Sequence, residues 1–425
     1  MQGSEPQTVF PSQYLALRIE QYSVQFWHMQ IHRSRSRLSF RRRRRRRSGG
    51  CLSVVVSLVL VVGVGVVSWL WINRINAPPV NNPSAGMMAS AQNAFDRGDL
   101  FGAVSLTRQI LSEEANDTDA LRLLTRSLIY RSYSEYNRSA DQRAALDATT
   151  EAVRLLPTNP DVLASHAFAL QASGRVSEAA EAAQRVLEKQ PDDAFARTAL
   201  ALSYGGAGAY ETALRESQRA VQSANAANAL DALRALAITY SDLGNYQEAV
   251  RTVDMAISVN RSIVVLYFER AQYALLLGDS DAATVAYFEV LAHDSTNVKA
   301  RLRLCELSSL MRERDHAIEY CQQVTQLAPS WFEGWYRLGM ENFLQGDFEA
   351  AQENLHRCST LQVLQNVPVT SLRFECWYIQ GQAAEVRGDC ESLIATYNEF
   401  RSIAADPQVQ QRWTYPPEGP PVCMG

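Results

Sequence analysis

The sequence lacks the short motifs that commonly mark an enzyme active site. It contains no G-x-S-x-G nucleophile turn, no phosphate-binding loop and no H-E-x-x-H metal-binding helix. The six histidines are scattered, and those after residue 76 occur singly, without paired metal-ligand spacing. Adjacent acids such as Glu113 and Glu114 are better explained as a solvated surface. These absences predict a protein without catalysis, without a metal or organic cofactor and without an evident small-molecule substrate.

Cysteine is missing from most of the chain. Of the seven cysteines, Cys51 stands alone and the other six occupy the last third of the sequence. No two of them are spaced as C-x-x-C, which argues against a zinc ribbon and against a thioredoxin-like redox site. The six in the last third are Cys305, Cys321, Cys358, Cys376, Cys390 and Cys423.

Positive charge is scarce after residue 76. Residues 1–76 hold 12 Arg and two acids, so residues 77–425 keep 29 basic and 43 acidic residues, a formal charge of -14. Such an acidic body argues against a nucleic-acid partner, because phosphate contacts require clustered positive charge. The arm 1–47, which ends in seven consecutive arginines, is predicted to be disordered, and Met29 is an alternative start to Met1.

A long apolar run follows the arginines. Cys51–Ile72 is 22 residues without a charge, mostly Val and Leu. A helix of this length covers roughly 33 Å, enough to cross the hydrocarbon core of a bilayer. We therefore expect a single transmembrane helix over residues 48–73. The arginines before it predict that the arm 1–47 is cytoplasmic and that the C-terminal body is extracytoplasmic, in a cell (plasma or inner) membrane.

Two alternatives to this signal anchor are consistent with parts of the sequence. A cleaved signal peptide has a shorter apolar core of about 7–15 residues and a small-residue cleavage site. Here the core is longer and runs into "INAPPV", so a retained single-pass anchor is favoured. The arginines could also bind nucleic acid or anionic lipid, although a topogenic role explains them more simply.

After a linker at residues 74–86, the chain repeats itself about every 34 residues. Short segments such as "GRVSEAA", "GAYETAL" and "GNYQEAV" recur, and the first four clear copies are 34, 36 and 34 residues apart. Each copy begins at a residue that we call the turn residue. The nine turn residues are Gly98, Ala140, Gly174, Gly208, Gly244, Gly278, Arg312, Gly346 and Gly388.

The residues around each turn predict a pair of closely packed helices. Alanine stands five positions after the turn residue in eight of nine copies, with Leu393 the exception, and seven positions before it the residue is small except at Tyr133. Flanking segments such as "ALRALAITYSDL" carry apolar residues at three- and four-residue steps, the period of a helix. Each copy therefore reads as helix–turn–helix, with small residues where the two helices meet.

These units resemble tetratricopeptide repeats, a 34-residue family with a W-x-x-L-G signature. Trp335, Leu338 and Gly339 reproduce that signature, and Trp377 with Gly381 reproduces part of it. The resemblance implies an all-α, right-handed α-solenoid of about nine units over residues 87–404, followed by a Pro-rich tail, 405–425. It departs in the second unit, with about eight extra residues near 116–125, and before the ninth. The units are near 85–118, 119–159, 160–193, 194–229, 230–263, 264–297, 298–331, 332–365 and 370–404.

The resemblance also implies that the concave side of the solenoid binds a protein or peptide partner. The Lys and Asn or Arg pairs that grip a terminal carboxylate in some family members are absent here, so an apolar helix or extended segment fits better. The alternative is that the candidate residues only pack between successive first helices. Trp335 and Trp377 are a separate case, because at the signature position they are expected to be core residues and not partner contacts. The candidate groove contacts are Phe168, Leu202, Arg234, Phe268, Gln272, Tyr336 and Tyr378.

On the same repeat frame, the cysteines in the last third could form three disulfides that stabilise the outer end of the solenoid. Cys305 could pair with Cys321 and Cys358 with Cys376, which leaves Cys390 with Cys423. Buried free thiols are an equally weighted alternative.

Three functions fit these features. The first is a membrane-tethered adaptor or scaffold that binds partner proteins through its groove on the extracytoplasmic side. The second is a chaperone-like factor that holds exported or membrane proteins. The third is a structural subunit of an envelope complex whose groove holds a constant partner.

Overall fold

The structure is a computed structural model, and it describes residues 83–136 and 138–406. The predicted arm, the transmembrane helix at 48–73, most of the linker and all but the first two residues of the tail lie outside the described residues. Within the described ranges, no helix is both long enough and apolar enough to cross a membrane.

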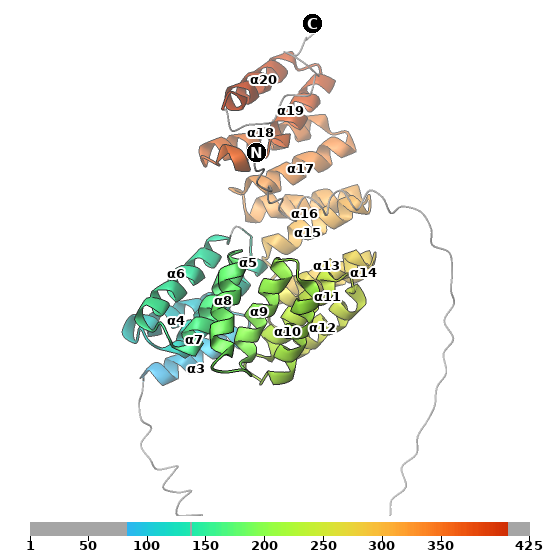
Figure 1. The fold of residues 1–425 in the computed structure, drawn as a ribbon. Helices are drawn as coiled ribbons and strands as arrows, with labels where there is room; N and C mark the ends of the chain where they lie inside the picture. Colours follow the sequence, from blue (N-terminus) through green and yellow to red (C-terminus); the bar gives the residue numbers. More distant parts are fainter. Residues whose placement is uncertain (1–82, 137, 407–425) are drawn as a thin grey trace, which may run out of the picture. The chain divides into compact units, whose positions relative to one another are not determined.

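The described residues form nine consecutive helix pairs and contain no strand, which confirms the predicted all-helical solenoid (Figure 1). A short 3-10 helix, η1 (Val369–Ser371), precedes the last pair. The pairs are α3 (Pro83–Asp96) with α4 (Leu100–Glu113), α5 (Thr118–Ser134) with α6 (Ala140–Leu155), α7 (Pro160–Ala172) with α8 (Val176–Leu187), α9 (Ala194–Gly206) with α10 (Tyr210–Ser223), α11 (Ala229–Asp242) with α12 (Tyr246–Val259), α13 (Val265–Leu276) with α14 (Ser280–His293), α15 (Val298–Leu310) with α16 (Arg314–Leu327), α17 (Phe332–Gln345) with α18 (Phe348–Leu364), and α19 (Glu375–Val386) with α20 (Cys390–Ala404).

Small residues allow the two helices of a pair to approach closely. The eight alanines that follow the turn residue by five positions are all fully buried. In the eighth pair, a Cβ atom at Gly339 would lie 2.6 Å from Cγ of Leu355, so a larger residue would push α17 away from α18. The repeated small residues therefore have a packing role.

Eight of the nine turn residues adopt a left-handed backbone conformation, which costs glycine little and other residues about 1–2 kcal/mol. The exception is Ala140, which is the first residue of helix α6. Gly244 has φ 77° with no neighbouring atom near its missing side chain. Arg312 occupies the same place in the seventh pair with φ 65°. The seventh turn, with arginine at this place, is therefore strained, whereas the turns with glycine are not.

Exchanging these two residue types tests that strain. We expect Arg312→Gly to stabilise the protein by roughly 0.5–1 kcal/mol, because glycine removes the left-handed penalty but gains freedom in the unfolded chain. Gly244→Arg should destabilise by a similar amount and serves as the reciprocal control. Urea unfolding followed by circular dichroism measures both; a loss of stability in Arg312→Gly would contradict the prediction.

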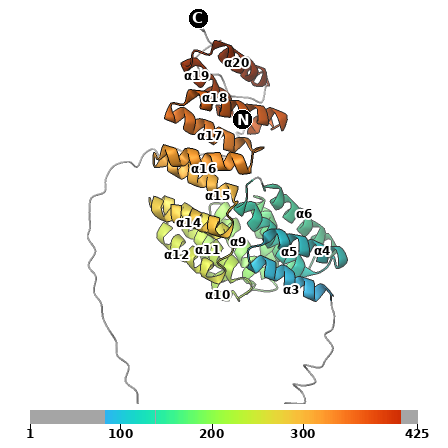
Figure 2. The ribbon, with the colours of Figure 1, turned by 180° about the vertical axis from the view of Figure 1, so that it is seen from behind.

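First helices lie on the inner side of the solenoid. Over the first pairs they contact one another directly, α5 with α7, α7 with α9 and α9 with α11, whereas successive second helices make far less contact. Figures 1 and 2 show α3–α14 gathered in one body and α15–α20 stacked beyond it.

The first six pairs close on themselves. Helix α5 is 17 residues long, the longest of the first helices, and it reaches α13, four pairs further along the chain. The α3–α4 turn also meets the loop before α13, because a Cβ atom at Gly98 would collide with the carbonyl of Ser262. One hydrophobic cluster runs from Phe95 on α3 to Leu266 on α13. We call residues 83–293 the ring and residues 298–404 the stack.

Candidate partner-binding surface

The chain's own helix α5 fills the inner face of the ring. Phe168 and Phe195, which lie on that face, are fully or almost fully buried with ring centres 5.0 Å apart. The Arg122 guanidinium of α5 lies over the Phe195 ring and pairs with Asp161. Leu202 and Phe268 are buried as well, so these predicted groove residues lie in intrachain contacts.

An ion pair between α5 and α11 lies at the centre of the ring. A nitrogen of Arg126 is 3.0 Å from an oxygen of Asp231, whose side chain has no exposed surface. The Tyr130 hydroxyl donates a hydrogen bond to the same carboxylate. The Arg126 guanidinium also stacks 4.6 Å from the centre of the Phe95 ring on α3. This cluster ties α3, α5 and α11 together.

A second buried ion pair lies beside the first. Arg234 on α11 is 2.6 Å from Glu269 on α13, and its guanidinium lies over the rings of Tyr130 and Tyr133 on α5. Burial opposes the charge on Arg234, but the Glu269 carboxylate outweighs it and raises the pKa of the guanidinium. Arg234, a predicted groove contact, is thus fully engaged within the chain.

Lys299 extends these contacts to the first helix of the stack. Its ammonium donates to the carbonyl of Tyr133 and lies 4.7 Å from the centre of the Phe268 ring. Burial, with the nearby charge of Arg303, lowers the pKa of Lys299 to about 8, although Glu269 and Glu135 act in the opposite direction.

This pKa predicts a pH-dependent stability with a definite sign. The folded protein disfavours the charged form of Lys299. The free energy of unfolding should therefore rise as the pH increases from about 8, the pKa in the folded state, towards 10.5, the ordinary pKa of lysine, by at most roughly 3 kcal/mol. The chain has only two lysines, so NMR of [¹⁵N]lysine-labelled protein gives two side-chain signals. Lys299→Met should abolish the rise, and the same change at exposed Lys189 should not. A Lys299 signal that titrates near 10.5 would contradict the prediction.

The inner face of the stack remains open. Residues four apart on a helix share a face, so Tyr336, Met340 and Leu344 form one stripe on α17. The corresponding residues on α19 are Tyr378, Gln382 and Val386. Tyr336 is buried and Tyr378 is half-buried, whereas the last residue of each stripe is exposed.

Exposed aliphatic side chains recur at the same place in each pair of the stack. Leu310, Leu344 and Val386 each lie two residues before a turn residue and are 51%, 50% and 57% exposed. In the ring, the one large aliphatic residue at this place is Leu276, and it is half-buried. The other ring residues at this place are Asp96, Arg138, Ala172, Gly206 and Asp242. We call Leu310, Leu344 and Val386 the aliphatic row; the sequence interpretation missed it, although aligning the repeats two residues before the turn would have revealed it.

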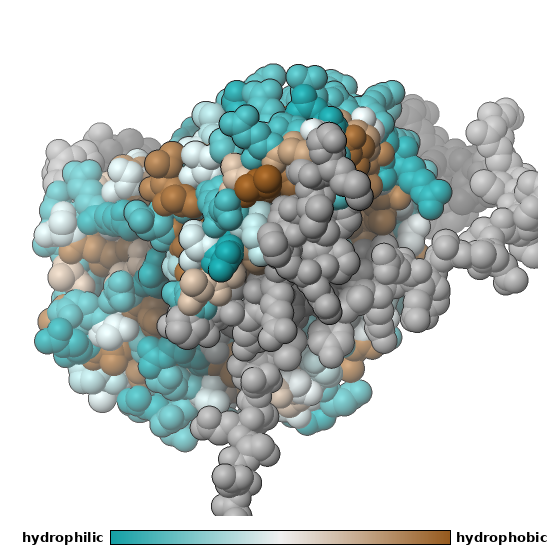
Figure 3. Space-filling model, turned by 90° about the horizontal axis from the view of Figure 1, so that it is seen from above, coloured by the Kyte–Doolittle hydropathy of each residue, from teal (hydrophilic) through white to brown (hydrophobic). Residues whose placement is uncertain are grey.

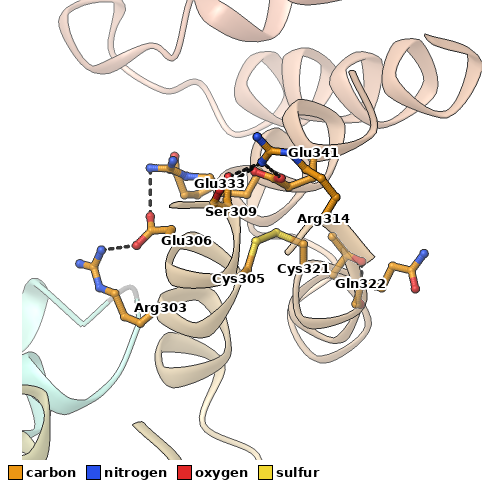
Figure 4. The surroundings of a disulfide bond; sticks show 11 residues. Arg303, Cys305, Glu306, Ser309, Arg314, Cys321, Gln322, Glu333 and Glu341 are labelled. Carbon is orange, nitrogen blue, oxygen red and sulfur yellow. Dashed lines mark hydrogen bonds and ion pairs between the residues drawn. A yellow bond between two sulfur atoms is a disulfide. The ribbon is translucent and has the colours of Figure 1, made fainter. Parts of the chain in front are cut away.

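A chain of ion pairs runs beside this row. Glu306 on α15 pairs with Arg303 and with Arg337, and Glu333 pairs with Arg337 and with Arg373, at 2.5–3.2 Å. Figure 4 shows three of these residues, Arg303 and Glu306 on α15 and Glu333 on α17. The guanidiniums of Arg337 and Arg373 also lie over the Tyr336 ring. These contacts hold the ring of Tyr336 in place.

Disulfides join helices within the stack. Cys305 on α15 is bonded to Cys321 on α16 across a Cα–Cα distance of 5.4 Å (Figure 4), and Cys358 on α18 to Cys376 on α19 across 5.9 Å. Cys390 is disulfide-bonded too. Cys423 lies outside the described residues.

The remaining predicted groove residue, Gln272, is exposed on α13. Five of the seven predicted groove residues are therefore buried, four of them in the ring and Tyr336 in the stack, whereas Tyr378 is half-buried and Gln272 is exposed. Figure 3, viewed from the side on which α20 lies, shows apolar residues interspersed with polar ones on the visible surface.

The described residues also contain a polar hollow of about 380 Å³ between α18, α19 and α20. Its walls include Glu349, Glu353 and Arg387. Arg387 donates to Gln352 in the same wall and lies near Glu349. No group of His, Cys, Asp and Glu in the described part of the chain is arranged to hold a metal ion.

Comparison with known proteins supports the predicted repeats. The sequence model of the tetratricopeptide repeat family matches residues 160–188, which span α7 and α8. A search of curated protein sequences finds no significant match.

Several solved structures are similar to this chain. The C-terminal part of a TPR repeat-containing protein from Cytophaga hutchinsonii is 15% identical, with 58% of this chain and 96% of that chain covered and a TM-score of 0.47. A tetratricopeptide repeat protein from Parabacteroides merdae is 17% identical, with 61% and 98% covered and a TM-score of 0.38. The human IFIT1 dimer with PPP-AAAA is 14% identical, with 75% and 82% covered and a TM-score of 0.46.

Proposed function

We propose that this protein is a scaffold that binds a partner protein through the open inner face of the stack. The aliphatic row carries this proposal. Three exposed aliphatic side chains, Leu310, Leu344 and Val386, occupy equivalent places in consecutive pairs. Leu344 and Val386 share a helix face with Tyr336 and Tyr378. The inner face of the ring is not open in the same way, since α5 fills it.

The spacing of the row favours an amphipathic helix as the bound segment. Packed helices are about 8–10 Å apart, so we expect the row to present one aliphatic side chain about every 10 Å. A partner helix that carries apolar residues seven positions apart repeats at about 10.5 Å. The two patterns match, and the tyrosine hydroxyls and the ion-pair chain would meet the polar edge of such a helix.

We further propose that a membrane anchor at residues 48–73 tethers this scaffold on the extracytoplasmic side of a cell membrane. The charge-free run of 22 residues and the arginines before it support this topology. The disulfides of the stack fit an oxidising compartment. The role proposed for the protein is recruitment of a partner, without a chemical step.

Photo-crosslinking in intact cells tests the binding surface. A photoreactive amino acid at Leu344 should capture a partner, and Leu310→Glu should abolish that capture. Val285→Glu is the matched control, because Val285 is a 54% exposed aliphatic residue on the second helix α14, outside the row. Capture that persists in Leu310→Glu but not in Val285→Glu would refute the proposed surface.

A chaperone-like factor is the second candidate function, and the apolar character of the row supports it. The identity of the captured proteins distinguishes it from a scaffold. One stoichiometric partner is expected for the scaffold, and many unrelated clients for the chaperone.

Protease digestion of intact cells or spheroplasts tests the topology: the stack should be cleaved without lysis, and complete protection would refute the extracytoplasmic placement.

A further inference from the structure

The junction between the ring and the stack is the weakest in the solenoid. Among the described helices, every other second helix contacts the next first helix more extensively than α14 contacts α15. A junction with few contacts between two well-packed bodies is a natural hinge. Something besides α14 must therefore hold the stack in one orientation.

Residues 133–136, at the end of α5, make the additional contacts; we call them the corner segment. The side-chain amide of Asn297 donates to the carbonyl of Ser134 at 3.3 Å. Its carbonyl oxygen accepts from the backbone N–H of Ala300 at 2.9 Å, which caps the start of α15. Asn297 is 1% exposed, so one buried side chain joins the end of α5 to the beginning of α15.

Electrostatics favours this meeting of helix ends. The last carbonyls of a helix lack partners within the helix and carry a partial negative charge, while the first turn of a helix carries a partial positive charge. Here the carbonyl end of α5 meets the amino end of α15. The Lys299 ammonium adds a donor, bonded to the carbonyl of Tyr133.

An apolar contact completes the corner. The Tyr136 ring lies 4.9 Å, centre to centre, from the ring of Trp331, a residue of the loop before α17. Both rings pack on a small cluster in the stack that is separate from the main clusters of the ring and of the last two pairs. The members of this cluster are Val298, Leu302, Val324 and Ala328. The second pair therefore covers an apolar surface of the seventh.

We propose that the corner segment is a brace that fixes the orientation of the stack relative to the ring, and that the α14–α15 junction is a hinge that opens when the brace is released. The contacts join residues more than 160 positions apart in the sequence. The brace thus sets the direction in which the open inner face of the stack points. This holds whether or not the stack binds the partner proposed above.

Single-molecule energy transfer on the full chain tests the brace. Dyes are attached through unnatural amino acids at Ser177 on α8 and Gln322 on α16, both exposed. The brace variant combines Asn297→Ser, Lys299→Met and Tyr136→Ala. Serine still caps α15 but is too short to reach Ser134. The expected result is a broader distance distribution with a shifted mean.

The control is Tyr210→Ala, which removes a 41% exposed aromatic ring on α10, away from the junction, and should leave the distribution unchanged. An unchanged distribution in a brace variant of normal helical content would overturn the proposal. Should the triple variant lose helical content, Asn297→Ser with Lys299→Met keeps the Tyr136 packing and takes its place. A broadened distribution in that double variant supports the brace, and an unaltered one overturns it.

Discussion

Reduction of the disulfides is expected to unfold the stack while the ring stays folded. Cys305–Cys321 and Cys358–Cys376 close loops of sequence separation 16 and 18, and a loop of this size contributes roughly 3 kcal/mol. Residues 83–304 contain no cysteine, so reduction breaks no covalent bond within the ring. Because repeat arrays are stabilised by neighbouring interfaces, the loss should remain local to the stack.

Two optical signals separate the bodies. Trp331, Trp335 and Trp377 lie in the last three pairs or the loop between them, and the ring has no tryptophan. The other four tryptophans of the chain lie outside the described residues and are replaced by phenylalanine for this measurement. After reduction, the tryptophan fluorescence transition should move to lower temperature, while most of the far-ultraviolet dichroism melts as before. Cys51→Ser is the control and should change neither signal. A common shift of both signals, or none, would show that the disulfides do not stabilise the stack independently.

The second large effect is expected from Asp231→Ala at the centre of the ring. The substitution leaves Arg126 buried without its carboxylate and Tyr130 without its acceptor. Removing one partner of a buried ion pair typically costs about 3–5 kcal/mol. The loss should appear in the dichroism transition of the ring and spare the fluorescence transition of the stack.

Two variants calibrate that result. Asp231→Asn keeps an acceptor for Tyr130 and should cost less than Asp231→Ala. Glu248→Ala removes an exposed ion pair with Arg251 on α12 and should cost less than about 1 kcal/mol. A cost for Asp231→Ala no greater than that of Glu248→Ala would mean that the central pair does not hold the ring together.

The helix pairs and their turns were predictable because their causes are local. A left-handed turn at Gly244 and a close helix contact at Gly339 each follow from a few adjacent residues. The seventh turn shows the same logic, since Arg312 was identified from its register although it is not glycine. Periodicity of this kind reports on neighbours in the chain.

The closure of the ring was not predictable in the same way. It depends on contacts such as Arg126 with Asp231, whose residues are more than 100 positions apart and look like ordinary helix residues in the sequence. The extra residues of the second unit are evident in the sequence, but nothing in the sequence indicates that α5 contacts α13. For this reason the sequence predicts Phe168 and Arg234 as groove residues, although they lie inside the ring.

Closure also restricts how the gene can change in length. The contact of α5 with α13 requires a fixed number of helix pairs between them. Gaining or losing one 34-residue unit there would move α13 away from α5 and break this contact. The contacts of the corner segment extend the same restriction as far as Trp331. Beyond Trp331 no such count applies, and an added pair could simply extend the array. Natural variation in copy number should therefore concentrate after that residue, where length is free to drift.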